Sequence, residues 1–397
     1  MVETAVTHLF THLRGLSGVE SMVRRHLRGD RTVRLVPDAV TFFEDGDFKR
    51  VSQTQLISGL GLTGKCCGLT LRSRFRQAIP RHPEGVRVYH EGWGMVTLAD
   101  LDRAQRRFAF LHSHWTGAER FFQGMEGLLD GVFCVSPAIQ EAIRNCIPSL
   151  PPERVRCILN PVDPPPSALL TERPAVRNEL VLGFCGRVVR QPKRVERLPE
   201  LARLLVAQGI PHRWEILGNG PDRPVLEQMF EGCGAPVHFH GALTGDAFWQ
   251  ALGGWDMIVF ASDFEGMPLA LLEALSIGVL PLFPRLPSGG RDAAERIAPE
   301  LVYESGNLED AVRAVAWWRG LSPEAHAELR ERGRNVVRPH ACEDYHRAFA
   351  EFVEEIVDRP RISATGIQAR RWHVGEWAPY TLLKRLQPSH VLRRGYL

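Results

Sequence analysis

Glu265 and Glu273 are two carboxylates eight positions apart in an apolar stretch of the chain. Gly266, Met267 and Pro268 follow Glu265 directly, and proline favours the first turn of a helix. Since one helical turn takes 3.6 residues, Glu273 is expected about two turns further on, near the same face. The sequence therefore predicts one carboxylate at the mouth of a helix and a second within it.

The start of this helix also offers free backbone N–H groups, which belong to Gly266, Met267 and Leu269. Together with the helix dipole, these groups attract an anion. Carboxylates bind hydroxyl groups, so two of them beside an anion-binding helix end suit a sugar joined to a diphosphate.

A basic loop is the second candidate feature. Gly186, Arg187 and Lys193 follow an expected buried strand and precede an expected helix. Two cations at that edge of a sheet would neutralise a diphosphate and stabilise it as it leaves. The alternative is a solvated basic loop, because Arg190 and Arg194 are present too.

Two further strand ends in the second half could contribute to the same site. Gly218 and Asn219 form a glycine turn after one strand, which is alternatively an ordinary strand-to-helix turn. Leu243 follows another strand, where a backbone edge could contact a nucleobase.

The first half holds weaker candidates. Gly15 and Gly18 precede an expected helix, where the backbone can approach a phosphate, although a flexible turn explains them equally well. His112 and His114 stand at a strand end, where a histidine can bind a sugar hydroxyl or support acid–base chemistry. A lone histidine is more often structural, and only its place at the strand end favours His112.

Several other patterns are rejected. The segment 59–65 resembles a P-loop, but Cys66 replaces the Ser or Thr, and we expect neither a strand before it nor a helix after it. The aspartate pairs at 45/47 and 100/102 are expected to be a hairpin turn and a helix start rather than a metal site. We expect no metal ion, and no Ser-His-Asp arrangement can be identified from spacing.

Alternating apolar runs and helical periods place these residues on a fold. In the second half, the expected strands are 180–186, 213–218, 237–241, 256–262, 279–283 and 301–303, with helices near 195–207, 223–231 and 246–252, one that carries Glu273 and one from 308. In the first half, strands are expected at 6–11, 33–37, 86–89, 108–112, 132–135 and 155–159, with helices at 19–27, 100–107 and 137–146. Because parallel strands need helical crossovers, each half is expected to be an α/β, doubly wound parallel sheet that binds ligands beyond the carboxyl ends of its strands.

The 397 residues suggest two domains. A proline-rich segment, 160–177, marks the boundary, so residues 1–170 and 171–340 are the expected domains. A helix is expected within 341–360, and 361–397 form a basic tail with seven Lys or Arg and one Glu.

Composition points to a soluble protein with 44% apolar and 24% charged residues. Neither a signal peptide nor a membrane span is expected, and eight scattered cysteines favour a reducing compartment, so we expect a cytoplasmic location. The tail mixes cations with Trp and Leu, which suits peripheral contact with an anionic membrane face. A charged extension packed back on the protein explains the tail equally well.

These pieces in this order resemble family-four retaining glycosyltransferases, group 1, which have the GT-B fold of two Rossmann-like domains facing across a cleft. The likeness is strong over about 180–320 and weaker at Leu111-His-Ser113, Val135-SPAIQEAI and Ile158-LNPV-Asp163. The family's Glu-x7-Glu signature corresponds to Glu265 and Glu273. The first domain would hold the acceptor and the second the nucleotide sugar.

The resemblance also implies roles for single residues. Glu265 would contact the hydroxyls of the donor sugar with the backbone of Gly266–Leu269, and Glu273 would hold the ribose. Arg187 and Lys193 would bind the diphosphate. Gly18 would approach it from the first domain, while His112 would face the sugar. The sequence departs from the family where it reads Ser-Gly-Val-Glu at 17–20, since a double glycine is usual there.

We therefore expect a retaining, metal-independent glycosyltransferase without a cofactor, whose donor is a UDP- or GDP-sugar. Its acceptor would be a glycan or a lipid-linked hydroxyl in cell-envelope or exopolysaccharide synthesis. The alternatives are a nucleotide-sugar epimerase or phosphorylase and a non-catalytic sugar-binding protein on the same scaffold. Nucleic-acid binding is disfavoured, because residues 1–360 carry a net charge of −3.

Overall fold

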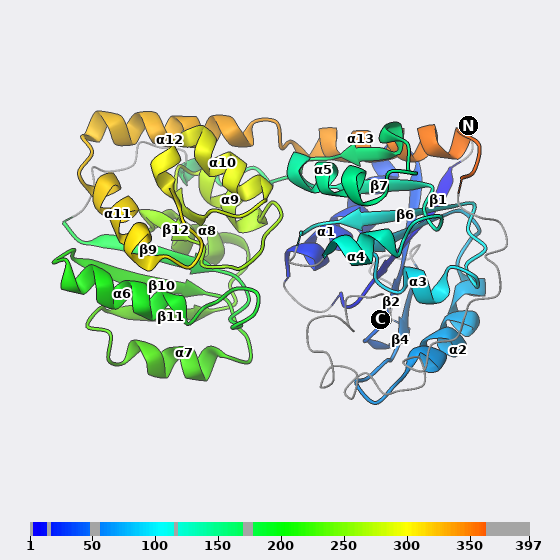
Figure 1. Ribbon diagram of the computed structural model, residues 1–397, viewed down its shortest axis with the longest axis horizontal. Coiled ribbons are helices and arrows are strands. Elements are labelled where there is room, and N and C mark those ends of the chain that lie inside the picture. Colours follow the sequence, from blue (N-terminus) through cyan, green and yellow to red (C-terminus); the bar gives the residue numbers. More distant parts are fainter. Residues whose placement is uncertain (1–2, 14–16, 48–55, 115–117, 170–177, 363–397) are drawn as a thin grey trace. The chain divides into compact units, whose positions relative to one another are not determined.

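The computed structural model describes residues 3–13, 17–47, 56–114, 118–169 and 178–362 (Figure 1). It divides into two compact units. The first runs up to Ile158 and resumes at Glu343, and the second comprises Leu159–Cys342. The sequence placed the division at residue 170, twelve residues further on. The basic tail beyond 362, with its predicted membrane contact, lies outside the described residues.

The first unit is built on a sheet in the order β3-β4-β2-β1-β5-β6-β7-β8, in which every pairing except β3 with β4 is parallel. The strands are β1 Thr4–Phe10, β2 Leu35–Thr41, β3 Asp45–Asp47, β4 Ile57–Leu60, β5 Val86–His90, β6 Arg106–Leu111, β7 Gly131–Cys134 and β8 Val155–Cys157. Its helices are α1 Gly18–Gly29, α2 Gly68–Ala78, α3 Met95–Leu98, α4 Ala118–Gln123, α5 Pro137–Cys146 and the returning α13 Cys342–Asp358.

The second unit is built on a parallel sheet in the order β11-β10-β9-β12-β13-β14. The strands are β9 Leu180–Cys185, β10 His212–Leu217, β11 Val237–Gly241, β12 Met257–Val259, β13 Leu280–Pro284 and β14 Val302–Tyr303. The helices are α6 Arg197–Ala207, α7 Arg223–Phe230, α8 Gly245–Gly253, α9 Leu269–Ser276, α10 Gly289–Ile297, α11 Leu308–Arg319 and α12 Pro323–Val337. Figure 1 shows α9, α10 and α12 together on one side of this sheet.

Both sheets are doubly wound, as predicted. The strand order reverses between β1 and β5 in the first unit and between β9 and β12 in the second. In open α/β sheets, ligands bind at such switch points, beyond the carboxyl ends of the strands. The residues that leave these four strands are therefore the first places to look for chemistry.

Three expectations in the first unit are wrong. Residues 100–107 do not form a helix, because Asp100 forms a two-point ion pair with Arg72 at 2.6 and 2.7 Å and Asp102 accepts the Tyr89 hydroxyl at 2.6 Å. A strand (β4) and a helix (α2) do flank the P-loop-like segment, contrary to expectation. The helix begins only at Gly68, however, so Lys65 lies outside it.

The aromatic core of the second unit explains one glycine within a strand. A Cβ on Gly183 of β9 would lie 2.0 Å from the ring of Trp255, which is fully buried. Only glycine lets the indole lie against the strand backbone there. Among the described residues, no helix combines the length and the apolar character that crossing a bilayer requires.

Candidate functional site

The loops that follow β9 and β12 are tied together at the switch point of the second unit. Asp263, after β12, pairs with Arg194 at 2.8 Å and with Arg197 at 2.9 Å. The Asp263 N–H also donates to the Pro192 carbonyl at 2.9 Å. Residues 66 to 71 positions apart in sequence therefore form one surface at the carboxyl edge of the sheet.

Lys193 and Glu265 meet on this surface. The Lys193 Nζ lies 2.6 Å from Oε1 of Glu265, and the Ser262 hydroxyl donates to the same oxygen at 2.6 Å. Glu265 is only 7% exposed, whereas the Lys193 side chain is 23% exposed. The arrangement is a buried carboxylate held by one hydroxyl and one cation that solvent still reaches.

The charge of Glu273 acts on the same neighbourhood. Burial and the charge of Glu273 raise the pKa of the Cys185 thiol to about 12, against the opposing charge of Lys193. Cys185 ends β9 and Glu273 lies within α9. Three of the four predicted charged residues, Lys193, Glu265 and Glu273, are thus gathered around the end of β9.

Arg187 is the fourth predicted charge and stands apart from the others. Its side chain is exposed, and it makes no hydrogen bond or ion pair within the described part of the chain. An exposed guanidinium in the loop after β9 remains free to pair with an added anion.

Hydrogen bonds from two other segments hold the residues that precede α9. The Asn160 side-chain amide donates to the Met267 carbonyl at 2.8 Å, and the Gly290 N–H donates to the Gly266 carbonyl at 3.1 Å. Pro268 is the N-cap of α9 and Leu269 its first residue. Gly266, Met267 and Glu265 are buried, while Pro268 and Leu269 are half-buried.

The glycine turn after β10 packs against the loop after β9. A Cβ on Gly218 would lie 1.8 Å from the Gly186 carbonyl oxygen, and one on Gly220 would lie 2.1 Å from that of Val188. Gly218 also has a φ of +132°, which only glycine adopts readily. The turn therefore fixes the loop backbone that carries Arg187. Asn219 is exposed and accepts the Val188 N–H at 3.0 Å. Leu243, after β11, is half-buried.

In the first unit, His112 does not act alone. It is 7% exposed, and burial lowers its pKa to about 3. Its Nε2 lies 2.9 Å from Nδ1 of His90, and its N–H donates to Glu91 at 3.1 Å. The predicted histidine is therefore a neutral ring in a hydrogen-bonded group.

Glu91 is a candidate that the sequence analysis missed. It follows β5 with a φ of +54°, a conformation that costs a non-glycine residue energy. Burial raises its pKa to about 8, while hydrogen bonds from Ser113 and from the His112 backbone lower it. Its Oε2 is buried and has no hydrogen-bond partner within the described part of the chain. Its place at the end of a switch-point strand was the available signal.

Gly18 is the first residue of α1, one position before the predicted start, and is exposed, with no atom within 4 Å of where a Cβ would lie. The helix start is already capped, however. The Ser17 N–H donates to Glu20 at 2.8 Å, and Glu20 accepts there with a negative charge. A phosphate at this helix end would have to approach a carboxylate.

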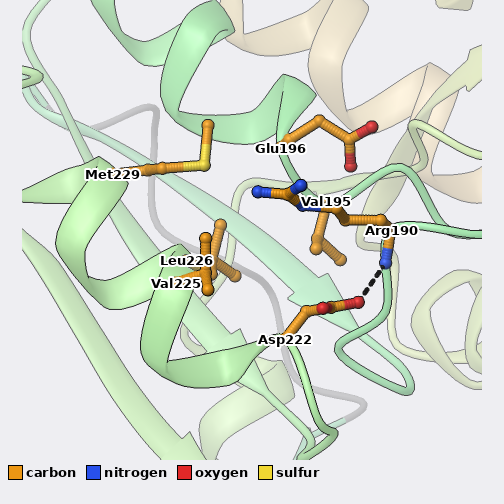
Figure 2. Close-up of a pocket in the computed structure, with 7 residues that line it drawn as sticks. All are labelled: Arg190, Val195, Glu196, Asp222, Val225, Leu226 and Met229. Atoms are coloured by element: carbon orange, nitrogen blue, oxygen red, sulfur yellow. Dashed lines mark hydrogen bonds between the residues drawn. The ribbon is translucent and has the colours of Figure 1, made fainter.

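A separate hollow lies beside the basic loop, away from Glu265. Figure 2 shows it between that loop and α7, with Val195, Leu226 and Met229 supplying apolar atoms. The Arg190 backbone N–H donates to Asp222 at its rim, at 2.7 Å. None of the predicted site residues lines it.

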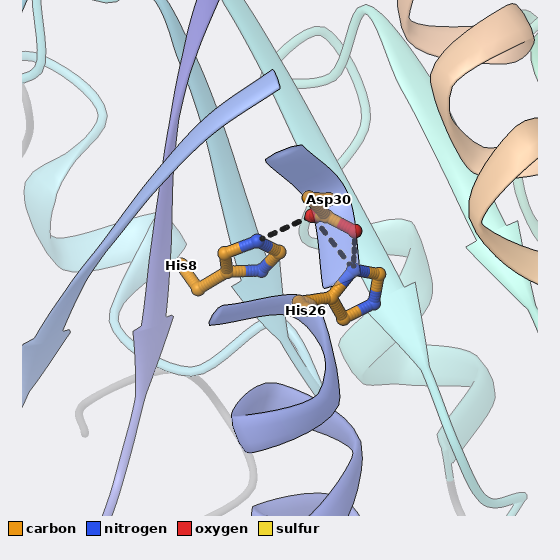
Figure 3. A group of neighbouring side chains, drawn as sticks. All are labelled: His8, His26 and Asp30. Carbon is orange, nitrogen blue, oxygen red and sulfur yellow. Dashed lines mark hydrogen bonds and ion pairs between the residues drawn. The ribbon is translucent and has the colours of Figure 1, made fainter. Parts of the chain in front are cut away.

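A second polar group lies in the interior of the first unit. One ligand-type atom from each of His8, His26 and Asp30 lies within 4.8 Å of the others, and all three residues are buried (Figure 3). The sequence analysis did not anticipate this group, because its members come from β1, α1 and the turn after α1.

Sequence comparison bears directly on the second unit. Residues 171–336 match the family described as Glycosyl transferases group 1. The resemblance to this family is thus confirmed. The matched stretch contains Arg187, Lys193, Glu265 and Glu273, and His112 lies outside it.

Two characterised relatives and one solved structure are similar to the chain. Sulfoquinovosyl transferase SQD2 of Arabidopsis thaliana is 33% identical over 125 residues, which are 30% of this chain and 23% of the relative. A GDP-mannose-dependent alpha-mannosyltransferase of Corynebacterium glutamicum is 28% identical over 149 residues, 38% of this chain and 33% of the relative. The matched segments thus span a third or less of either relative.

The Anabaena protein HepE, solved in complex with UDP and glucose, superposes with a TM-score of 0.67. The superposition covers 89% of this chain and all of that protein, at 14% sequence identity. Likeness at that identity concerns the fold, which is the GT-B fold of two Rossmann-like domains. The predicted fold class is confirmed.

Proposed function

We propose that this protein is a retaining glycosyltransferase that moves a sugar from a nucleotide diphosphate to a hydroxyl acceptor. The observation that carries the proposal is the Lys193–Glu265 contact of 2.6 Å at the switch point. The charges of Glu273 and Lys193 both act on Cys185 at the end of β9. The matched family and the names of both relatives, one sulfoquinovosyl and one mannosyl transferase, support glycosyl transfer.

In the proposed mechanism, the diphosphate binds at the loop after β9. The exposed Arg187 and the solvent-accessible Lys193 neutralise the charge that grows on the leaving oxygen. Lys193 then lies between the phosphate and Glu265, whose carboxylate stays oriented by Ser262. Glu265 accepts hydrogen bonds from the sugar hydroxyls, and Glu273 accepts them from the ribose.

Retention follows if the acceptor hydroxyl attacks on the face that the diphosphate leaves, and its proton passes to the departing phosphate oxygen. The two cations supply the charge stabilisation that a metal ion supplies in other transferases. For this reason we propose that no divalent metal takes part. The donor is a UDP- or GDP-sugar and the acceptor a glycan or lipid-linked hydroxyl. The cleft between the domains stays a prediction.

A screen of UDP- and GDP-sugars with hydroxyl acceptors, in excess EDTA, tests this function. Product with the donor's anomeric configuration, read by NMR, is expected from the wild type. For alanine variants of Arg187 and Lys193, Arg190→Ala is the matched control, because Arg190 is an exposed cation in the same loop. Inverted product, strict dependence on a divalent ion or conversion of the donor without any acceptor would each contradict the proposal.

A further inference from the structure

Three histidines form a hydrogen-bonded row that runs from His112 into the interior of the first unit. Nε2 of His112 lies 2.9 Å from Nδ1 of His90, and Nε2 of His90 lies 3.0 Å from Nδ1 of His8. The row ends on Asp30, whose Oδ2 lies 3.5 Å from Nε2 of His8. His8, His90 and Asp30 are fully buried, and they come from β1, β5 and the turn after α1. We call His112, His90 and His8 the histidine row.

Asp30 is ionised at the inner end of the histidine row. Burial alone would raise its pKa, but the charge of His26 and the hydrogen bonds from His26, His346 and His8 outweigh burial and hold the pKa below its ordinary value. Nδ1 of His26 lies 3.0 Å from both oxygens, and Nδ1 of His346 lies 2.7 Å from Oδ1. Figure 3 shows His8 and His26 turned toward this carboxylate.

An ionised carboxylate can only accept, so the histidine nitrogens that face it must carry protons. The proton of His8 is then on Nε2, and its Nδ1 presents a lone pair to His90. A neutral imidazole has one donor and one acceptor, and burial keeps the pKa of His90 well below its ordinary value. His90 therefore donates from Nε2 to His8 and accepts at Nδ1 from His112.

We propose that Asp30, acting through His8 and His90, fixes the proton of His112 on Nε2 and keeps its Nδ1 as an acceptor for a hydroxyl group of the bound sugar. The proposal rests on the proposed function and on the resemblance, which implies that His112 faces the donor sugar. Asp30, His8 and His90 are positioning residues. An acceptor nitrogen attracts a sugar hydroxyl and repels phosphate oxygens, which have no proton to donate, so the fixed tautomer also selects which part of the donor lies there.

The Nδ1 atom of His112 is available for this role. Within the described part of the chain it makes no hydrogen bond, and His112 itself is 7% exposed. The ring is held in place by stacking on Phe110 at 4.4 Å and by the donation of the His112 N–H to Glu91. Both the orientation and the proton of this ring are thus set by the protein.

A metal ion at His8, His26 and Asp30 would give the opposite result. A metal bound to Nε2 of His8 takes that lone pair and moves the proton to Nδ1. His8 would then donate to His90, His90 would donate to His112, and His112 would carry its proton on Nδ1. A second proton on His8 would reverse the row in the same way. The tautomer of His112 therefore distinguishes an ionised Asp30 at the inner end of the histidine row from a metal ion or a second proton at His8.

The tautomers can be read by long-range proton–nitrogen NMR on ¹⁵N-histidine-labelled, ligand-free protein at neutral pH. Loss of one signal set in His112→Gln identifies His112. In the wild type we expect a single Nε2–H tautomer for His112. In His90→Phe, which removes the link, we expect both tautomers in exchange. Tyr345→Phe is the control, because its hydroxyl contacts Nε2 of His26 at 2.7 Å and not the row. It should leave the His112 signals unchanged.

Binding then tests the hydroxyl contact. His90→Phe should weaken binding of the nucleotide sugar about tenfold. Binding of the free nucleotide diphosphate should be unchanged, since only the sugar contacts His112. An Nδ1–H or doubly protonated His112 in the wild type, a wild-type spectrum in His90→Phe, or equal weakening of both ligands would each overturn the proposal. So would one equivalent of zinc retained by purified protein. The tautomer of the wild type is measured without ligand and without activity. The prediction for it can therefore be contradicted while the proposed function stands, and the reverse.

Discussion

Lys193 has a structural as well as a chemical role, because it is the cation that accompanies the buried carboxylate of Glu265. Lys193→Ala removes that cation and leaves Glu265 with the Ser262 hydroxyl as its remaining side-chain donor among the described residues. Loss of the charged partner of a buried carboxylate costs about 1–3 kcal/mol, so the free energy of unfolding should fall by that amount. Arg187→Ala should cost less than about 0.5 kcal/mol, since Arg187 is exposed.

Urea unfolding of the two variants beside the wild type measures this difference. The sequence alone gives no reason for the two variants to differ in stability, because it does not reveal the ion pair. Equal stability of Lys193→Ala and Arg187→Ala would show that Glu265 does not depend on Lys193.

Glu91 should make stability depend on pH. Its pKa is about 8 when folded, against an ordinary value of 4.5, because burial favours the neutral acid. Between these values the unfolded chain releases a proton that the folded chain keeps, so stability falls as the pH rises from about 4.5 to 8. Glu91→Gln removes this loss and should raise the melting temperature by a few degrees at pH 8.

The same variant should melt close to the wild type at pH 4.5, where both carry a neutral side chain at position 91. Thermal melts at several pH values check this. A constant difference between the two proteins across the range would contradict the pKa assignment.

At the scale of elements, the loop that carries Arg187 depends on the glycine turn after β10. Gly220→Ala would place a Cβ 2.1 Å from the Val188 carbonyl oxygen, so the loop backbone must move. We expect a loss of about 1–3 kcal/mol in stability and weaker binding of a nucleotide diphosphate.

Gly232→Ala is the matched control, because no atom lies within 4 Å of its Cβ position. Calorimetric titration and urea unfolding compare the two variants. If Gly220→Ala resembled Gly232→Ala in both measurements, the contact would not position the loop.

The elements of the second unit could be predicted well, because each strand is a short apolar run bounded by polar or glycine residues. The helices α6, α7 and α11 also lie close to where hydrophobic periodicity placed them. Helix α10 was not predicted. Gly289 and Gly290 begin it, and glycine is a poor helix former. Gly290 is required there, since a Cβ would lie 2.4 Å from Phe283.

The site was predictable only in part. Lys193 and Glu265 follow strands and Glu273 lies within the next helix, so alternation alone brings them to one sheet edge. The support from Asn160 was not predictable, because it comes from 107 positions away. The histidine row was hidden for the same reason, since its residues show no spacing pattern and meet only through the pairing of β1 with β5 and of β5 with β6.

At the scale of the whole molecule, the first unit is completed by a helix from the far end of the chain. In α13, Phe349 is fully buried and its ring lies 4.7 Å from Phe133 of β7 and 4.4 Å from His26. Arg106 donates to the carbonyls of Ile356 and Val357 at 3.0 and 2.8 Å, near the end of the helix. Residues 343–358 are therefore part of the first folding unit.

Phe349→Ala should destabilise that unit by about 3–5 kcal/mol through lost burial and a cavity. Hydrogen exchange is expected to become faster in β1, β6 and β7, while β9, β10 and β13 keep their protection. Glu354→Ala, at an exposed position of the same helix, should exchange like the wild type. Faster exchange throughout both sheets in Phe349→Ala would mean that the units do not fold as separate bodies.

The central claim is that Lys193 and Glu265 grip different parts of one activated sugar, and calorimetric titration of nucleotide diphosphates and their sugars tests it most directly. The wild type should bind UDP or GDP. Lys193→Ala should weaken binding of the diphosphate by about tenfold or more, which is the scale of one lost charge-assisted hydrogen bond. Glu265→Gln should weaken only the sugar nucleotide, and Arg190→Ala should change neither. Diphosphate binding that is unchanged in Lys193→Ala would contradict the account.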